Sequence, residues 1–548
     1  MNYLGKITVI GVLSLTFLWT TEATAQSDGG RLFGNLEANT NFYMRDSAIG
    51  AANIPQYDNQ LFGADAWLTL NYSNWGFDFG MRFDMFHNSQ LLNPTGSYND
   101  HGIGRWFVRR NIDDLAITAG YIYDQIGTGV IFRAYEERAL LIDNALIGVR
   151  LAYDLNDNWR VRAFTGKQKR QFSHYGSVIR GLALDGFVQV GDERPAIFAP
   201  GFGVVARTLD DDSMNGIVNT LRFYTPEDRE GLDPKFNTYA FSVYNTLTYG
   251  PFSWYVEGAY KSPEIMFDPL AIRSDGLGGK IQGSLIKSSG SVFYTSLSYS
   301  RSGWGITLEG KRTDNFSFRT DPQLELNFGQ INFLPPMSRQ NTYRLTSRYV
   351  PATQELGEYA FQADVRYSPN RQWSFNGNFS NITNLDGDLL YREMLLEARY
   401  RYQRQWVATV GIQRQEYDQD LFEGKPGVPM VNTITPYAEF LYRFTPRNSL
   451  KLEAQYMSTD EDFGSWIFFL AEYSVSPRWI FSASAMYNID PTMTDKLLYP
   501  TMSVVYNTGA NRFSLSYIKQ VEGVVCTGGI CRLEPAFSGM RFSVISNF

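Results

Sequence analysis

The chain has 548 residues, of which 49 are Lys or Arg and 56 are Asp or Glu, so its formal net charge is −7. Its mean hydropathy of −0.27 excludes a bundle of transmembrane helices, and its balanced charge argues against nucleic-acid binding. Only 3 His and 2 Cys accompany a large aromatic content of 15%, which leaves little for metal sites or a disulfide framework.

The first 25 residues have the layout of a secretory signal peptide. A positive charge at Lys6 is followed by an apolar stretch from Ile7 to Trp19 and a small-x-small site ending at Ala25. The apolar stretch is too short to cross a bilayer comfortably. We therefore expect residues 1–25 to be removed on export and residues 26–548 to form one domain.

Beyond residue 25 the dominant period is two, as expected for strands with one apolar and one polar face. Phe252, Trp254 and Tyr260 share one face of a predicted strand, and Glu257 and Lys261 share the other. The same alternation marks residues 392–402, 433–444, 450–456 and 479–487. A soluble sandwich would also alternate, so further features must decide between the two.

Aromatic residues gather beside short turns, as in Trp373, Trp406 and Trp479. Rings beside turns are typical of the aromatic girdle of a membrane barrel. Longer polar loops are expected between the short turns, at Glu264–Gly276 and Tyr417–Val431.

The last strand ends in an aromatic residue and resembles the assembly signal of outer-membrane barrels. Its apolar face comprises Met540, Phe542, Val544 and Phe548. The sequence therefore predicts an all-β fold: a single large antiparallel transmembrane β-barrel of about 26 strands (22–26), with short periplasmic turns and long extracellular loops.

Three stretches read neither as clean strands nor as polar loops, namely Tyr123–Ala145, Asp192–Arg222 and Asn315–Arg339. A barrel of this width needs filling if it is not to enclose a large aqueous hole. Each stretch is therefore a candidate to fold into the lumen. The short segment before the first strand offers no room for a plug domain or an energy-coupling segment, so we expect no energy-coupled transport.

Thr118–Val149 reads TAGYIYDQIGTGVIFRAYEERALLIDNALIGV and Ile518–Pro535 reads IKQVEGVVCTGGICRLEP. Together with Leu32–Phe42 and Thr307–Phe318, these segments resemble an uncharacterised family of Bacteroidota outer-membrane barrel proteins. The resemblance implies an outer-membrane location and supplies no binding or catalytic residues.

One charged block lies between two predicted strands. Its candidate lumen or constriction residues are Arg133, Glu136, Glu137, Arg138 and Asp143. Facing charges of this kind select solutes in channels, although a salt-bridged segment that merely fills the barrel fits the pattern better.

A second set of charges is predicted to face the lumen from neighbouring strands: Glu393, Glu397, Arg399, Arg401, Glu439, Arg443, Lys451 and Glu453. These residues either line a conducting path or, as we consider the better interpretation, form a cross-strand charge ladder that stiffens the wall.

Cys526 and Cys531 flank a Gly-Gly bend in a loop predicted to be extracellular, where a disulfide is the expected outcome. Asp210–Asp212 do not have the spacing of a calcium loop. His101 and His174 have no nucleophile signature beside them. We therefore expect no enzyme activity, no metal and no other cofactor.

Two functions remain open. The first is a passive, porin-like channel of the cell outer membrane. The second is a plugged barrel that serves as a structural subunit or docking platform of a surface complex. The expected partners are outer-membrane lipid, the barrel-assembly machinery and, for the second function, other surface proteins.

Overall fold

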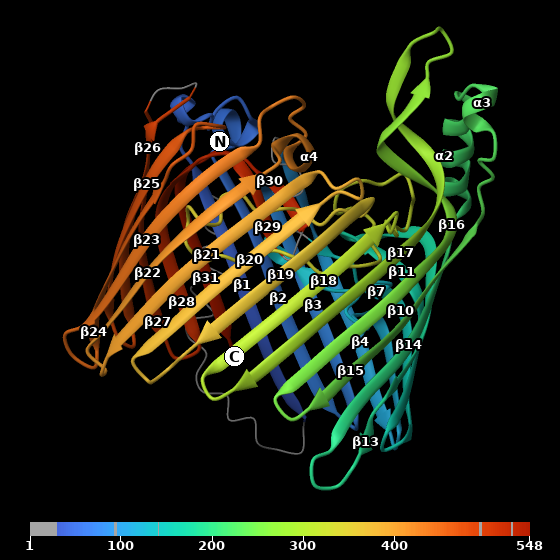
Figure 1. Cartoon of the computed structure of the whole chain (residues 1–548), viewed down its shortest axis with the longest axis horizontal. Coiled ribbons are helices and arrows are strands. Elements are labelled where there is room, and N and C mark those ends of the chain that lie inside the picture. Colours follow the sequence, from blue (N-terminus) through green and yellow to red (C-terminus); the bar gives the residue numbers. More distant parts are fainter. Residues whose placement is uncertain (1–29, 92–95, 141, 493–495, 528–529) are drawn as a thin grey trace, which may run out of the picture.

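A computed structural model describes residues 30–548 except 92–95, 141, 493–495 and 528–529. One antiparallel sheet of 25 strands dominates it, and 24 of these strands form a closed barrel (Figure 1). The barrel is closed by β1 and β31, which pair from Asn35 opposite Asn547 to Tyr43 opposite Gly539. The predicted fold class is confirmed, and the strand number lies within the predicted range of 22–26.

The barrel strands are β1 (Arg31–Tyr43), β2 (Phe62–Asn74), β3 (Phe77–Ser89), β4 (Tyr98–Ile112), β5 (Leu115–Ile122), β10 (Leu146–Asn156), β11 (Trp159–Arg170), β12 (Ser173–Gly186), β14 (Ala196–Thr208), β15 (Asn237–Tyr249), β16 (Phe252–Ser274), β17 (Lys280–Arg301), β18 (Trp304–Asp314), β19 (Gly357–Tyr367), β20 (Trp373–Thr383), β21 (Leu389–Tyr402), β22 (Trp406–Tyr417), β23 (Val431–Arg443), β24 (Asn448–Met457), β25 (Ser465–Val475), β26 (Trp479–Asp490), β27 (Leu498–Thr508), β28 (Asn511–Gln520) and β31 (Phe537–Asn547).

The other elements are the short strands β6 (Gln125–Ile126), β7 (Phe132–Arg133), β8 (Glu136–Glu137), β9 (Ile142–Asp143), β13 (Val188–Val190), β29 (Gly523–Thr527) and β30 (Ile530–Glu534), the helices α2 (Asp211–Arg222), α3 (Pro226–Arg229) and α4 (Gln419–Glu423), and the single turns η2 (Ser47–Ile49), η3 (Gln56–Gln60) and η4 (Arg138–Leu140). Within the described residues, no helix combines the length and the apolar character that crossing a bilayer requires.

Alternation along each strand separates the two faces of the wall. In β23, Thr433 and Thr435 point inward and are 1% and 0% exposed, whereas Ile434 between them points outward and is 50% exposed. The outer face is therefore apolar and the inner face largely polar, as the period of two predicts.

Outward aromatic rings form contacts near the short turns. The ring centroids of Trp304 and Tyr367 lie 4.1 Å apart, and those of Trp479 and Tyr506 lie 4.5 Å apart. Trp373 stands 4.7 Å from Tyr400 in the same way. These pairs form a band of rings at the end of the barrel where the strands are joined by short turns and where the last strand ends.

The expected loop Glu264–Gly276 is instead mostly strand. The strands β16 and β17 stay paired as far as Ser274 opposite Lys280, with bulges between Lys261 and Glu264 and between Asp268 and Ile272. The resulting hairpin rises well above the rim (Figure 1). Outside a membrane a hairpin needs no strict alternation of apolar and polar residues, so the sequence pattern of this segment does not reveal its pairing.

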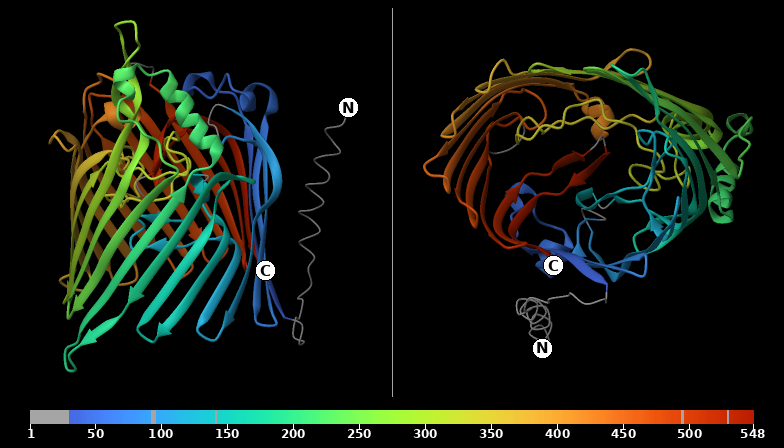
Figure 2. Two further views of the ribbon diagram at one scale, coloured as in Figure 1. Left: turned by 90° about the vertical axis from the view of Figure 1, so that its right-hand side faces the viewer. Right: turned by 90° about the horizontal axis from the view of Figure 1, so that it is seen from below.

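Asp192–Arg222, one of the three candidates to fold into the lumen, does not enter it. Residues 196–208 form the barrel strand β14, and residues 211–222 form helix α2. Met214, Ile217 and Leu221 are buried in a cluster with Ile265 and Leu285 at the base of the tall hairpin. The helix therefore packs at the rim, outside the ring of strands (Figure 2).

The signal-peptide prediction for residues 1–25 lies outside the described residues, and it stays a prediction.

Candidate functional site

Two segments that connect neighbouring barrel strands fold into the lumen. Residues 123–145 lie between β5 and β10, and residues 315–356 lie between β18 and β19. The two inner segments contact each other: the amide of Arg133 donates to the carbonyl of Ile331, and that of Phe333 to Gly129, both at 2.9 Å. Seen along the barrel, they cross the interior (Figure 2).

The inner segments carry their own apolar core. Ile126, Val130 and Ile131 are 0% exposed, as are Phe316 and Phe318 of the second segment. They pack against inward wall residues in one cluster. The apolar runs that broke the strand pattern are therefore the residues that attach these segments to the wall.

Charged wall residues hold the backbone of the second inner segment. Lys261 donates to the carbonyl of Ser317 at 2.5 Å, and Arg207 donates to that of Arg319 at 3.0 Å. Glu264 binds both cations, at 2.6 Å from Lys261 and 2.7 Å from Arg207. All three wall side chains are almost fully buried, so each needs these partners to offset the loss of water.

Amide side chains hold the far part of the same segment. Gln413 donates to the carbonyl of Thr346 at 3.0 Å, and Gln415 donates to that of Tyr349 at 3.1 Å. Segment 315–356 is thus bound to the wall along much of its length, although it contains no regular secondary structure.

The predicted charged block 133–143 lies inside the barrel, and two of its residues, Glu136 and Asp143, meet at one wall arginine. Arg82 of β3 binds both carboxylate oxygens of Asp84, at 2.6 and 2.8 Å, and Asp143 at 3.0 Å. It also binds Glu136. Arg82 is only 3% exposed, so one buried cation is surrounded by three carboxylates.

The network extends beyond Arg82. Arg138 binds Glu136 at 3.0 Å and Glu37 of β1 at 2.6 Å. Lys169 of β11 binds Asp143. Burial by itself would raise the pKa of Asp143, but the nearby charges of Lys169 and Arg82 hold that pKa below its ordinary value. Asp143 therefore stays ionised and holds both cations in place.

The other two residues of the block have different surroundings. The guanidinium of Arg133 stacks on Tyr135 and on Phe333, 4.6 and 4.1 Å from the ring centroids. Glu137 pairs with Ile142 in the small hairpin of β8 and β9.

Sequence reasoning missed Arg82, Asp84 and Lys169. The inward faces of Arg82 and Asp84 follow from the alternation along β3, whereas Lys169 lies at a register shift of β11 that the alternation does not predict. However, Arg82 is 54 residues from Glu136 and 61 from Asp143 in the sequence, and no local sequence pattern predicts ion pairs between residues so far apart.

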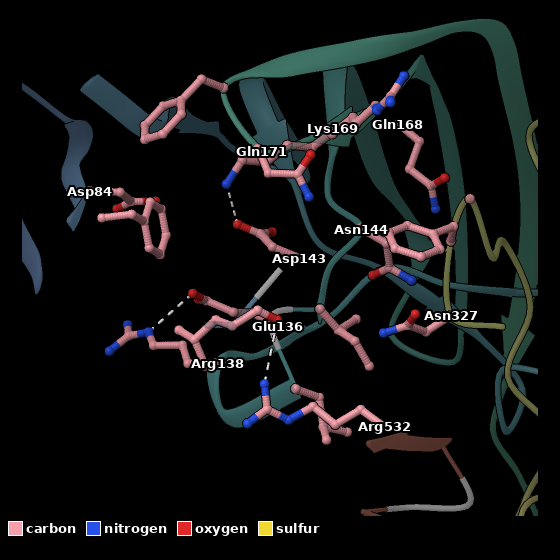
Figure 3. Close-up of a pocket in the computed structure, with 18 of the residues that line it drawn as sticks. Asp84, Glu136, Arg138, Asp143, Asn144, Gln168, Lys169, Gln171, Asn327 and Arg532 are labelled. Carbon is pink, nitrogen blue, oxygen red and sulfur yellow. Dashed lines mark hydrogen bonds and ion pairs between the residues drawn. The ribbon is translucent and has the colours of Figure 1, made fainter. Parts of the chain in front are cut away.

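A cavity of about 400 Å³ lies where the two inner segments, the wall and β30 meet. Figure 3 shows Asp84, Glu136 and Arg138 on one side of it and the amides of Asn144, Gln168 and Asn327 on the other. Arg170 and Arg532 also line it. The cavity thus combines an ion-pair network with amides and two further cations.

The eight predicted wall charges share the inward face but have few charged partners. Glu393, 0% exposed, accepts from Asn341 and Gln413, both at 2.8 Å. Glu397 accepts from Tyr437 at 2.8 Å.

Within the described residues, the only ion pair among the eight is Lys451–Glu453, at 3.9 Å on one strand. Glu439 lies directly opposite Glu453 in the register, so the charges are not placed as a ladder of opposite signs. Arg399, Arg401 and Arg443 lie toward the short turns and are exposed.

The terminal strand completes the barrel wall. Met540 and Phe542 point outward and are 41% and 42% exposed. Phe548 exchanges two backbone hydrogen bonds with Gly34 of β1, at 2.7 and 3.1 Å. The last residue of the chain thus belongs to the seam that closes the sheet.

The hairpin of the two cysteines turns inward. The strands β29 and β30 place Cys526 opposite Cys531, and the hairpin points into the barrel interior (Figure 2). It was expected to form the tip of an outer loop. No disulfide is among the bonds that the structure describes, and the cysteine side chains lie outside the described residues, so the disulfide stays a prediction.

The other polar candidates have structural surroundings. Asp210 is the residue before α2, and Asp211 and Asp212 occupy its first turn, where acidic residues favour a helix. His101 and His174 are exposed on separate strands. In the described part of the chain, no three His, Cys, Asp or Glu residues are grouped to hold a metal ion.

A family model described as a family of unknown function, DUF6029, matches residues 4–548. The match confirms an uncharacterised family and leaves the expected Bacteroidota origin untested. None of the curated proteins is similar in sequence to the chain.

Solved structures of large barrels are similar at a low level. The P pilus usher PapC translocation pore has a TM-score of 0.42 and 9% identity, over 94% of this chain and 99% of that chain. The siderophore receptor PirA from Pseudomonas aeruginosa has a TM-score of 0.42 and 10% identity, over 94% and 80%. The ferric-catecholate import receptor Fiu from E. coli K12 has 0.38 and 10%, over 95% and 82%. Scores of this size carry no argument about function.

Proposed function

The chain belongs to the uncharacterised DUF6029 family, and we propose that it is an outer-membrane barrel through which small solutes diffuse along their own gradients. The observation that carries the proposal is the cavity of about 400 Å³ between the inner segments and the wall, which several charged side chains line. In the proposed channel, this region with its charged side chains is the narrow, selective part.

The outer surface supports the membrane location. Leu396, Val410 and Phe469 point outward from the middle of their strands and are 66%, 55% and 56% exposed. Apolar residues exposed over a whole barrel mark contact with lipid. A closed sheet also leaves no unpaired backbone edge, which lipid would penalise.

The wall toward the short turns supports a wet lumen. Inward serines follow one another across adjacent strands here, and Ser503 and Ser516 are in hydrogen-bonding contact at 2.9 Å. Both are partly exposed, whereas Ser242 and Ser380, which also face inward, are 1% and 0% exposed. Small polar residues of this kind suit a water-filled vestibule below the inner segments.

The proposal gives the chain no enzyme activity and no cofactor. Transport is proposed to be passive because buried ion pairs and an apolar core fix the described parts of the inner segments to the wall, which leaves them little freedom to move. The proposed partners are membrane lipid and, during biogenesis, the barrel-assembly machinery.

Conductance in planar lipid bilayers tests the proposal. The purified full chain is expected to give stable single-channel steps with little voltage dependence, because the inner segments are fixed. Silence at every voltage, from protein whose folded state is verified by its resistance to unfolding in cold detergent, would refute a channel.

A second candidate function, a closed barrel acting as a structural subunit, is favoured by one observation. A buried apolar cluster runs along the inner face from Tyr294 of β17 to Phe537 of β31, joined by Leu345 and Tyr349 of the second inner segment. A continuous apolar layer resembles a protein core more than a pore lining. Silence in the bilayer together with stoichiometric co-purification of partners in mild detergent would favour this function.

A further inference from the structure

The cavity between the inner segments is lined by polar groups that are not all used in hydrogen bonds or ion pairs among the described residues. The charged residues around Arg82 are paired with one another: the cations are Arg82, Arg138 and Lys169, and the carboxylates are Asp84, Glu136, Asp143 and Glu37. Two lining cations lie outside this network, Arg170 and Arg532. The first question is therefore what these two are paired with.

Arg170 has no carboxylate partner within the described residues. Its guanidinium lies over the ring of Tyr175, 5.6 Å from the centroid. Arg532 binds Glu534 at 2.9 Å through one nitrogen and donates to the carbonyl of Leu91 at 3.4 Å through another, while its buried Nε has no hydrogen-bond partner in the described part of the chain. The lining thus contains one cation without a carboxylate partner, Arg170, and one unused donor, Nε of Arg532, which together favour an anion.

The amide side of the cavity offers further unused groups. Gln168 is 2% exposed and donates to the carbonyl of Gln330 at 2.6 Å, but its Oε1 accepts no hydrogen bond among the described residues. A buried acceptor without a partner costs free energy. The side chains of Gln171 and Asn327 line the same cavity and are only partly buried. These groups suit a ligand that carries hydroxyl groups, because a hydroxyl both donates and accepts.

Apolar surface lies beside these polar groups. Phe328 and Leu326 of the second inner segment line the cavity and are 40% and 76% exposed although they lie inside the barrel. An aromatic face beside amides offers stacking to the apolar face of a ring. A cavity of about 400 Å³ lies within the range of small-molecule sites.

From these groups we infer that the cavity binds a hydroxyl-rich small anion of the sugar-acid class. Its carboxylate lies toward Arg170 and Arg532, its hydroxyl groups contact Gln168 and the neighbouring amides, and one face of its ring lies against Phe328. The inference rests on the proposed channel only in naming the solute that the channel would carry, because binding itself needs no conduction.

The test is isothermal titration calorimetry of the purified full chain in detergent with glucuronate, with glucose and acetate as comparison ligands. Glucuronate is expected to bind and glucose to bind at least tenfold more weakly, because glucose lacks the charge. R170Q and R532Q are each expected to weaken glucuronate binding roughly ten- to hundredfold, the effect of losing a charge-assisted hydrogen bond.

R404Q is the matched control, because Arg404 is an exposed arginine of a short turn away from the cavity. It is expected to bind glucuronate as the unmodified chain does. Circular dichroism and heat-modifiable migration verify that each variant is folded. R170Q removes no ion pair of the described structure, so it tests the site even if R532Q misfolds.

Three outcomes would overturn the inference: no glucuronate binding at millimolar concentration, equal binding of glucose, or an R170Q variant that binds like R404Q. The proposed channel is judged separately by conductance. Binding without conductance would refute the channel and leave the site, whereas conductance without binding would refute the site alone.

Discussion

Gly104 of β4 leaves room for the carboxylate of Asp84, which lies on the neighbouring wall strand β3. A Cβ atom at Gly104 would lie 1.8 Å from Oδ2 of Asp84 and 2.1 Å from its Cγ. Asp84 would have to move, and its two hydrogen bonds to Arg82 would be lost. The absence of a side chain at position 104 is therefore a condition for the network that joins β3 to the first inner segment.

We predict that Gly104→Ala destabilises the barrel by about 1–3 kcal/mol, the usual cost of forcing extra volume into a packed site. Thermal unfolding in detergent, followed by heat-modifiable migration, measures the loss. Gly258→Ala is the control, since a Cβ atom there meets nothing within 4 Å. Equal melting temperatures for the two variants would show that the Arg82 network contributes nothing to stability.

At the scale of single residues, the sequence predicts the charged residues of the inner segment but not their partners on the barrel wall. The charge density of Glu136, Arg138 and Asp143 between two strands predicts an internal, salt-bridged segment, and all three side chains lie in the lumen. Their partners on the wall are specified by the register of strands far away in the chain, which alternation does not reveal. Only the structure shows that the amide nitrogen of Gln168 donates to the carbonyl of Gln330, while its Oε1 accepts no hydrogen bond among the described residues.

Segment 315–356 is an insertion between two strands that already touch. Asp314 lies opposite Gly357 in the register of β18 and β19, so a two-residue turn would join them. The sequence predicted the first part of this segment, Asn315–Arg339, from its apolar runs. The rest, up to Leu356, is polar enough to pass for an outer loop, and it lies inside because Gln413 and Gln415 bind its carbonyls.

Glu264–Gly276 is predicted to be a loop but is mostly strand, and Asp192–Arg222 is a candidate for the lumen but lies in the wall and at the rim. Both differences have the same physical origin. Lipid and water impose different patterns on a strand, so a hairpin that leaves the membrane loses its alternation without losing its hydrogen bonds. Helix α2 has an apolar face because it packs on that hairpin through Ile217 and Leu221, and an apolar run alone does not tell the inside of a barrel from its rim.

We predict that replacing residues 315–356 by Asn-Gly leaves a closed barrel and raises its single-channel conductance several-fold, because a barrel of 24 strands is wide enough to hold an aqueous channel once it is emptied. Single-channel recording in planar bilayers measures the change. Shortening the tall hairpin by replacing residues 269–279 with Asn-Gly is the control, since this part stands above the rim and is expected to leave conductance unchanged. A segment variant that conducts no better than the full chain would show that segment 315–356 does not limit the path.

At the scale of the whole molecule, the barrel has the reverse of a soluble protein's polarity: its outer face is apolar and its polar residues and charges are inside. This arrangement was predictable, because a period of two together with aromatic residues at the short turns requires two different environments for the two faces. The segments that fill the lumen were not predictable, since their positions depend on which wall residues contact which inner segment. The polarity of the outer face does not depend on what fills the lumen, so the membrane location is testable without reference to any transported solute.

Leu396 of β21 and Ser484 of β26 allow this test, because both lie within barrel strands but on opposite faces. Leu396 points outward and is 66% exposed, and Ser484 points inward. If lipid covers the outer face, Leu396→Arg is expected to cost about 2–4 kcal/mol of folding free energy in phospholipid vesicles, the cost of placing Arg at the lipid face near the midplane. Ser484→Arg faces the polar lumen and is expected to cost less than about 1 kcal/mol. Urea titrations of tryptophan fluorescence in vesicles measure both values. Equal costs for the two variants would mean that both faces meet the same medium, and the membrane location would then have to be abandoned.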